Sequence, residues 1–215
     1  MAAIDAEIIR RILAGEKNLF QELIRPYERM VYLAAFSTLR NEAEAEDATQ
    51  ETMLNAYRHL GSFRAESKFS TWLVTIAVNE ARQRLRKERR APVNSIEESV
   101  EDREGDYTPA LLTDWREVPL EALERAEVRE KIKTAVEELP GIYREVFTLR
   151  DLEEMDVHET AQVLGITPAL VKVRLHRARI LLQKALAPYL KRVDSPRRSF
   201  LERVLPFAAR RGGMT

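Results

Sequence analysis

Apolar residues recur every three to four positions over most of this chain, which is the spacing of one helical face. The pattern runs from about residue 4 to 90 and resumes from about residue 120 to 190. Breaks in the first stretch fall at Gly15, Pro26, Asn41 and residues 61–70. Few runs alternate between apolar and polar residues, so strands are not expected. We therefore predict an all-α protein.

Residues 92–119 separate the two helical stretches and lack a long apolar stripe. This segment contains three prolines, and residues 94–118 hold eight acids and two bases. Such a composition is typical of a linker. The sequence therefore predicts two small helical domains, 1–91 and 120–187, joined by a flexible acidic linker, with a basic tail over 188–215.

Composition narrows the choice of compartment. The chain has no cysteine, which excludes a disulfide framework and a thiolate zinc site. No apolar run approaches the roughly 18 residues of a membrane span. The first residues, with Ile4, Ile8 and Ile12 among charges, predict an amphipathic helix rather than a signal peptide. We expect a protein of the cell interior.

The segment "DVHETAQVLGITPALVKVRLHR", residues 156–177, carries a helix-turn-helix pattern. Asp156 and Glu159 have the spacing of a capping box, and Gly165 permits a left-handed turn. Pro168 lies in the first turn of the second helix. In this motif the second helix enters the major groove of duplex DNA.

The second helix has an apolar stripe and a cationic face. The cationic positions are Lys172, Arg174, His176 and Arg177. Such side chains neutralise phosphates and donate to guanine edges. A solvated basic helix is the alternative, but the turn and helix upstream favour DNA binding.

A second candidate surface combines aromatic and basic residues in "SFRAESKFSTWLVTIAVNEARQRLRKERR". Aromatic rings beside cations are a platform for single-stranded bases. The residues assigned to this role are Phe63 and Arg64 near the loop, Asn79 for a base edge, and Arg82 and Arg86 for the backbone. Trp72 is expected to pack in the core rather than to stack on a base.

The segment "NEAEAEDATQETMLNAY" is acidic. Acids stabilise the start of a helix through the dipole, and on charge alone this interpretation is favoured. The alternative is a docking surface for a basic partner.

Together these segments resemble the extracytoplasmic-function (ECF) sigma factors, small two-domain initiation subunits of bacterial RNA polymerase. The resemblance rests on three motifs in order: "AEAEDATQETMLNAYRHLGSF", "FSTWLVTIAVNEARQRLR" and "LPGIYREVFTLRDLEEMDVHETAQVLGITPALVKVRLHRARILL". It covers about residues 5–90 and 120–187. It also reverses the interpretation of the acidic helix, because the corresponding segment of the family docks on polymerase.

The resemblance implies a role for each surface. Asp47, Gln50, Glu51 and Leu54 would bind the clamp helices of the largest subunit of core RNA polymerase. The first domain would recognise and melt the minus-ten promoter element and capture a base in the loop from Leu60 to Lys68. The second domain would recognise the minus-thirty-five element as duplex.

The resemblance also implies partners. An anti-sigma factor is expected, with the chain a monomer when free or a heterodimer with that factor, cytoplasmic or held at the membrane through it. No small-molecule substrate, cofactor, metal or catalytic residue is expected. The tail, with Phe200, Leu201, Val204, Leu205 and Phe207 at helical spacing, is either disordered or docks on polymerase, an anti-sigma factor or a membrane.

Two other classes of protein would explain part of the sequence. A stand-alone helix-turn-helix regulator would explain residues 120–187 but not the acidic helix or the aromatic–basic segment. An enzyme is the weakest alternative. The three histidines lie far apart in sequence, and there is no Gly-rich phosphate loop.

Overall fold

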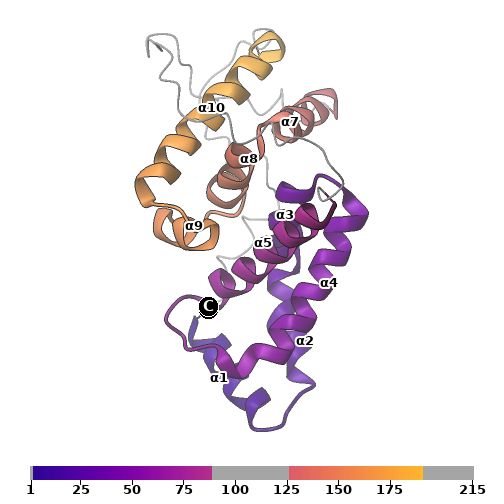
Figure 1. The fold of residues 1–215 in the computed structure, drawn as a ribbon, viewed down its shortest axis with the longest axis vertical. Helices are drawn as coiled ribbons and strands as arrows, with labels where there is room; N and C mark the ends of the chain where they lie inside the picture. Colours follow the sequence, from indigo (N-terminus) through magenta and orange to yellow (C-terminus); the bar gives the residue numbers. More distant parts are fainter. Residues whose placement is uncertain (1, 89–125, 191–215) are drawn as a thin grey trace, which may run out of the picture. The chain divides into compact units, whose positions relative to one another are not determined.

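The computed structural model describes residues 2–88 and 126–190, and within these ranges it contains helices and no strand (Figure 1). The all-α prediction is confirmed. The predicted linker, and the tail beyond residue 190, lie outside the described residues. Contacts divide the chain into two compact units, Met1–Ser95 with Thr148–Lys172 and Ile96–Phe147 with Val173–Thr215, called here the first and second units.

The first unit is built on three long helices. Its elements before the linker are α1 (Ala2–Leu13), α2 (Leu19–Ile24), η1 (Arg25–Tyr27), α3 (Glu28–Leu39), α4 (Glu42–His59), η2 (Leu60–Ser62) and α5 (Phe69–Glu88). Helices α3, α4 and α5 pack against one another in every pairing. Small side chains at their contact bring the backbones close. They include Ala35, Ala45, Ala48 and Ala81, all with no exposed surface.

The breaks predicted from the sequence have identifiable causes. Helix α3 ends at Arg40, whose φ of 58° is left-handed. The Asn41 side chain then accepts a hydrogen bond from the Glu44 N–H at 3.1 Å and begins α4. Helix α1 is the predicted amphipathic helix, since Ile9 and Ile12 are buried. Its Asp5 accepts a hydrogen bond from the Tyr27 hydroxyl at 2.7 Å.

The predicted turn between the two helices of the helix-turn-helix is confirmed. Helices α9 (Val157–Leu164) and α10 (Pro168–Leu190) flank Gly165, whose φ is 69°. Asp156 caps α9, and Glu159 completes the capping box. Backbone N–H groups of Glu159 and His158 hold the pKa of Asp156 below its usual value.

Polar contacts attach α9 to α5 and to the loop directly before it, within the first unit. The Lys68 ammonium lies 2.8 Å from a Glu159 carboxylate oxygen. The Arg82 guanidinium donates to the Leu164 carbonyl at 3.1 Å. Arg82, assigned from the sequence to nucleic acid, is therefore engaged by protein in this structure.

The second unit contains α7 (Ala126–Glu138), α8 (Gly141–Phe147) and most of α10. Apolar side chains of each helix are buried, among them Tyr143 and Leu182. The buried Arg144 closes the end of α7, because its guanidinium donates to the carbonyls of Glu137 at 3.0 Å and Leu139 at 2.6 Å. This satisfies carbonyls that a helix end leaves without partners.

Glu153 follows the π-helical turn η6 (Thr148–Leu152) and, unlike most acidic residues, has a buried side chain. Its side chain is only 7% exposed and pairs with Arg29 of α3 at 3.2 Å. Burial raises the pKa of Glu153 to about 7, against an opposing effect of Arg29. The carboxyl group therefore takes up a proton on folding between about pH 4.5 and 7.

We expect Glu153 to make the fold less stable as pH rises. Because its folded pKa lies above the unfolded value, its stabilising contribution is complete below the unfolded pKa and is lost through about pH 7. The full difference is on the order of 3 kcal/mol at most. Urea denaturation of wild type and Glu153→Gln from pH 5 to 8 measures this pH-dependent difference in stability. The free energy of unfolding of the variant should rise relative to that of wild type as pH rises. Parallel plots of unfolding free energy against pH would contradict the raised pKa of Glu153.

Candidate functional site

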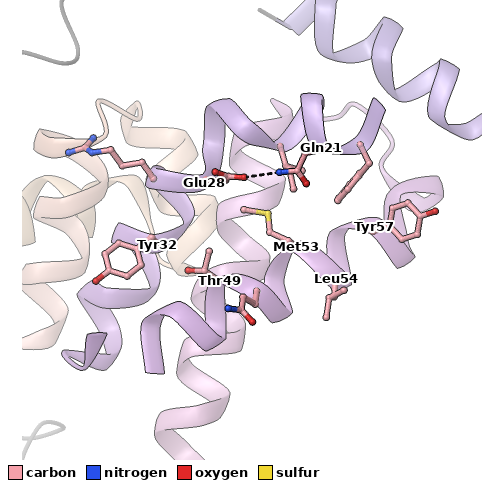
Figure 2. A pocket seen from close by; sticks show the side chains of 11 residues that line it. Gln21, Glu28, Tyr32, Thr49, Met53, Leu54 and Tyr57 are labelled. Carbon is pink, nitrogen blue, oxygen red and sulfur yellow. Dashed lines mark hydrogen bonds between the residues drawn. The ribbon is translucent and has the colours of Figure 1, made fainter. Parts of the chain in front are cut away.

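An open groove with a volume of about 780 Å³ lies between α4 and helices α2 and α3 (Figure 2). Its walls are mostly apolar, formed by Phe20, Ile24, Tyr32, Met53, Leu54 and Tyr57. Gln21 and Glu28 lie along one side and are hydrogen-bonded to each other at 3.3 Å. Figure 2 shows Met53 pointing from α4 into the space beside this pair.

Two large side chains of the groove remain exposed. Leu54 is 49% exposed and Tyr57 is 39% exposed. The Tyr57 ring packs edge-on against Phe20 with 5.0 Å between ring centroids, which holds it in place. Exposed apolar side chains gathered beside a groove are typical of a protein-binding surface.

The four residues predicted to bind polymerase share α4. Gln50 and Leu54 line the groove, whereas Asp47 and Glu51 lie beside it on the same helix. Met53 and Tyr57, three to four residues from Gln50 and Leu54, also line the groove, although the predicted set of four does not include them.

The acids beside the groove are held only weakly by their neighbours. Glu51 lies 3.4 Å from the Arg58 guanidinium, and Asp47 lies 4.0 Å from Arg84. Exposed pairs of this kind contribute about 0–1 kcal/mol, so a partner's cations can replace them at little cost.

A second hollow, with a volume of about 600 Å³, lies between the end of α4 and helix α5 and is more polar. Asn55 and His59 of α4, together with Ser62, form one wall. The α5 wall consists of Trp72, Ile76, Asn79, Glu80, Gln83 and Arg86. Amide groups beside an aromatic ring can bind the edge and face of one unstacked base.

His59 has a defined hydrogen-bonding role at this hollow. Its Nδ1 lies 2.9 Å from the Asn55 carbonyl oxygen. A carbonyl oxygen only accepts, so Nδ1 carries the proton and donates. In the neutral ring, Nε2 is left as an acceptor.

The residues predicted to bind single-stranded DNA are partly brought together. Asn79 and Arg86 line the hollow, with Gln83 between them at helical spacing, a residue the sequence reasoning missed. Arg64 is exposed in the loop before α5. Phe63 is half-buried, and its ring packs against Trp72 at 5.4 Å between centroids, so it supports the hollow without lining it.

The four predicted duplex-binding residues all lie on α10. Lys172 and His176 are exposed, one turn apart, whereas Arg174 and Arg177 are half-buried. Val171 and Leu175 of the same helix are buried. Two of the four predicted cations, Lys172 and His176, are therefore exposed, whereas Arg174 and Arg177 lie at the border of the buried stripe.

The described ranges contain neither a candidate metal site nor a candidate membrane span. No group of three or more His, Asp or Glu side chains there could hold a metal ion. No helix of residues 2–88 or 126–190 is long and apolar enough to cross a membrane.

Comparison with known proteins identifies the class. The model of Sigma-70 region 2 matches residues 23–91, and that of Sigma-70 region 4 matches residues 129–182. The chain is 33% identical over 189 residues to the RNA polymerase sigma-H factor of Pseudomonas aeruginosa, covering 87% of this chain and 96% of that one. It is 32% identical to the ECF RNA polymerase sigma factor SigW of Bacillus subtilis, covering 83% and 94%.

The fold is also similar to that of solved sigma factors. The sigma factor RpoE of Bartonella quintana, solved with the anti-sigma factor NepR, matches with a TM-score of 0.57. That match has 23% identity and covers 78% of this chain and 96% of the other. CnrH, solved with the cytosolic domain of CnrY, matches with a TM-score of 0.56 and 24% identity, covering 86% and 97%.

These matches define a sigma-70-type initiation factor with regions 2 and 4. The chain belongs to the family of ECF RNA polymerase sigma factors. It directs promoter-specific transcription initiation and is not an enzyme, because members of this family act by binding.

Proposed function

We propose that the groove beside α4 binds core RNA polymerase and that the polar hollow beside α5 binds the melted minus-ten element. The observation that carries this proposal is that α4 contributes to both sites. Leu54 and Tyr57 line the groove, whereas Asn55 and His59 of the same helix line the hollow. A rigid helix shared by the two sites would hold a captured base at a fixed position relative to polymerase.

In the polymerase site, Leu54 supplies apolar contact and Gln50 a hydrogen-bonding amide. Asp47 and Glu51 supply charge for a basic partner. The expected partner is the pair of clamp helices of the largest subunit. Complementary charge guides association, and the apolar centre supplies most of the affinity.

In the minus-ten site, Asn79 and Gln83 bind the edge of one extruded base and Trp72 packs against its side. Arg86 and the exposed Arg64 contact the DNA backbone. Extruding a base costs a few kcal/mol, which a preformed hollow offsets. Phe63 has a positioning role here, because its ring supports Trp72.

In the second domain, we assign duplex recognition of the minus-thirty-five element to Lys172, Arg174, His176 and Arg177 of α10. The proposed boundaries of the domains are 1–91 and 120–187, with the acidic linker of 92–119 between them. Both family models fall inside these bounds, which supports them.

We also propose control by an anti-sigma factor, supported by the solved complexes of similarly folded sigma factors with such proteins. Because its partner is core RNA polymerase, the chain would act in the bacterial cytoplasm. An anti-sigma factor anchored in the membrane would hold it there when inactive.

Polymerase docking is tested by Leu54→Asp. A charge at the centre of an apolar contact should weaken binding to core RNA polymerase at least about tenfold, or 1.4 kcal/mol. Ile4→Asp is a matched control, because Ile4 is an apolar residue 63% exposed that does not line the groove. Equal affinities of the two variants, measured by fluorescence anisotropy with labelled chain, would contradict the docking site.

Base capture is tested by Asn79→Ala in the reconstituted holoenzyme. Loss of contacts to one base edge should weaken binding of a single-stranded minus-ten oligonucleotide by about 1–3 kcal/mol. Asn18→Ala serves as control, since Asn18 is exposed and its side chain makes no capping bond. An unchanged affinity for the oligonucleotide would remove Asn79 from the site.

Duplex recognition is tested by Arg174→Ala and Arg177→Ala in run-off transcription with core polymerase. Each should cost about 1–3 kcal/mol at promoters with the correct minus-thirty-five element if it contacts a guanine edge. An equal loss on all promoters would make it a phosphate contact. Lys133→Ala, an exposed cation of α7, should have no effect. Transcripts that never depend on this chain would overturn the proposed function.

A further inference from the structure

The polymerase groove has the features of a site for an amphipathic segment. Leu54 and Tyr57 are exposed beside it, and Met53 points into it (Figure 2). Its acids lie near this apolar wall. Glu28 lines the groove, and Glu46, exposed, precedes Gln50 by one turn of α4.

The bases at the groove are engaged by acids. Arg29 also lines it and lies 3.2 Å from the carboxyl group of Glu153, which is ionised above about pH 7. Arg58, near Tyr57 along α4, lies 3.4 Å from Glu51. The groove therefore suits a segment with an apolar face and flanking positive charge.

The tail of this same chain has that chemistry. Residues 191–215 carry seven bases and two acids. Phe200, Leu201, Val204 and Leu205 have the spacing of one helical face, and Ser195-Pro196 is a helix-start sequence. Arg197, Arg198 and Arg203 accompany the apolar positions. The family matches end before this segment, so neither regions 2 nor 4 account for it.

We propose that residues 196–207 bind in the groove between α4 and helices α2 and α3. Phe200, Leu201 and Leu205 would contact the apolar wall, and the arginines would face Glu28 and Glu46. The regulatory consequence rests on the proposed function. If polymerase uses the same groove, the tail competes with it and lowers the amount of chain free to form holoenzyme.

The tail needs only a modest affinity for the groove, because it belongs to the same chain. A segment joined to its site through a flexible linker, as the sequence predicts for residues 92–119, has an effective concentration of about 1 mM. If the tail as a free peptide had a Kd of about 100 µM, the same tail attached to the chain would give a ratio of occupied to empty groove of about ten. An added competitor would then bind about tenfold more weakly than to an empty groove.

The test is an anisotropy titration of a fluorescent peptide of residues 195–211 with full-length chains. In Leu201→Asp/Leu205→Asp the tail should leave the groove, and the peptide should bind with a Kd of about 100 µM or lower. Wild type should bind it about tenfold more weakly, because its own tail competes. Adding Leu54→Asp to the double variant should abolish binding, with an unchanged urea midpoint as the folding control.

Ala208→Asp/Ala209→Asp is the matched control, since it adds the same two charges beyond Pro206 and beyond the proposed binding segment of residues 196–207. It should behave as wild type. Equal peptide affinity for wild type and the Leu201→Asp/Leu205→Asp chain, or full binding with Leu54→Asp present, would overturn the proposal. Binding of the peptide to anionic vesicles but not to the chain would also overturn it. A wild-type dimer in sedimentation that the double variant loses would overturn it too, because the groove would then hold the tail of a second copy.

The assay contains no polymerase, so its failure leaves the proposed function intact. A separate titration with core RNA polymerase reports the consequence. The Leu201→Asp/Leu205→Asp chain should bind polymerase several-fold more tightly than wild type. Failure of every chain to bind polymerase would instead overturn the proposed function while the peptide result stood.

Discussion

The close packing of α4 against α3 and α5 through small side chains is the contact on which the rest of the first unit depends. Ala45, Ala48 and Ala56 of α4 have no exposed surface. Alanines leave no room for larger side chains between the helices, so the backbones approach closely and the crossing is specified by fit. The functional side chains of α4 are therefore those on its remaining faces.

This constraint explains why one helix contributes to two sites. On a helix packed along one side, residues three and four apart form separate stripes. Gln50, Leu54 and Tyr57 lie on one stripe, at the apolar groove. Asn55 and His59 lie on another, at the polar hollow. Since α4 cannot rotate without disturbing the alanine contact, the two surfaces keep a fixed relation to each other.

The sequence predicted what depends on local chemistry. The cap at Asp156, the turn at Gly165 and the helix start at Pro168 all follow from residue type, and all are found. The hollow could not be predicted, because its walls come from α4 and α5, and no local spacing relates Asn55 to Gln83. The hydrogen bond from Arg82 to the Leu164 carbonyl could not be predicted for the same reason, since it joins residues 82 positions apart.

The zero formal charge of the chain is an average over segments of opposite sign. Acids are concentrated on α4 and in residues 94–118, whereas bases are concentrated from Lys172 onward. Charged segments of one sign attract partners of the opposite sign and guide their approach. Acidic segments favour a basic protein surface, whereas basic segments favour the phosphates of DNA. Segregation of charge along the chain therefore lets one neutral protein carry separate surfaces for two partners of opposite charge.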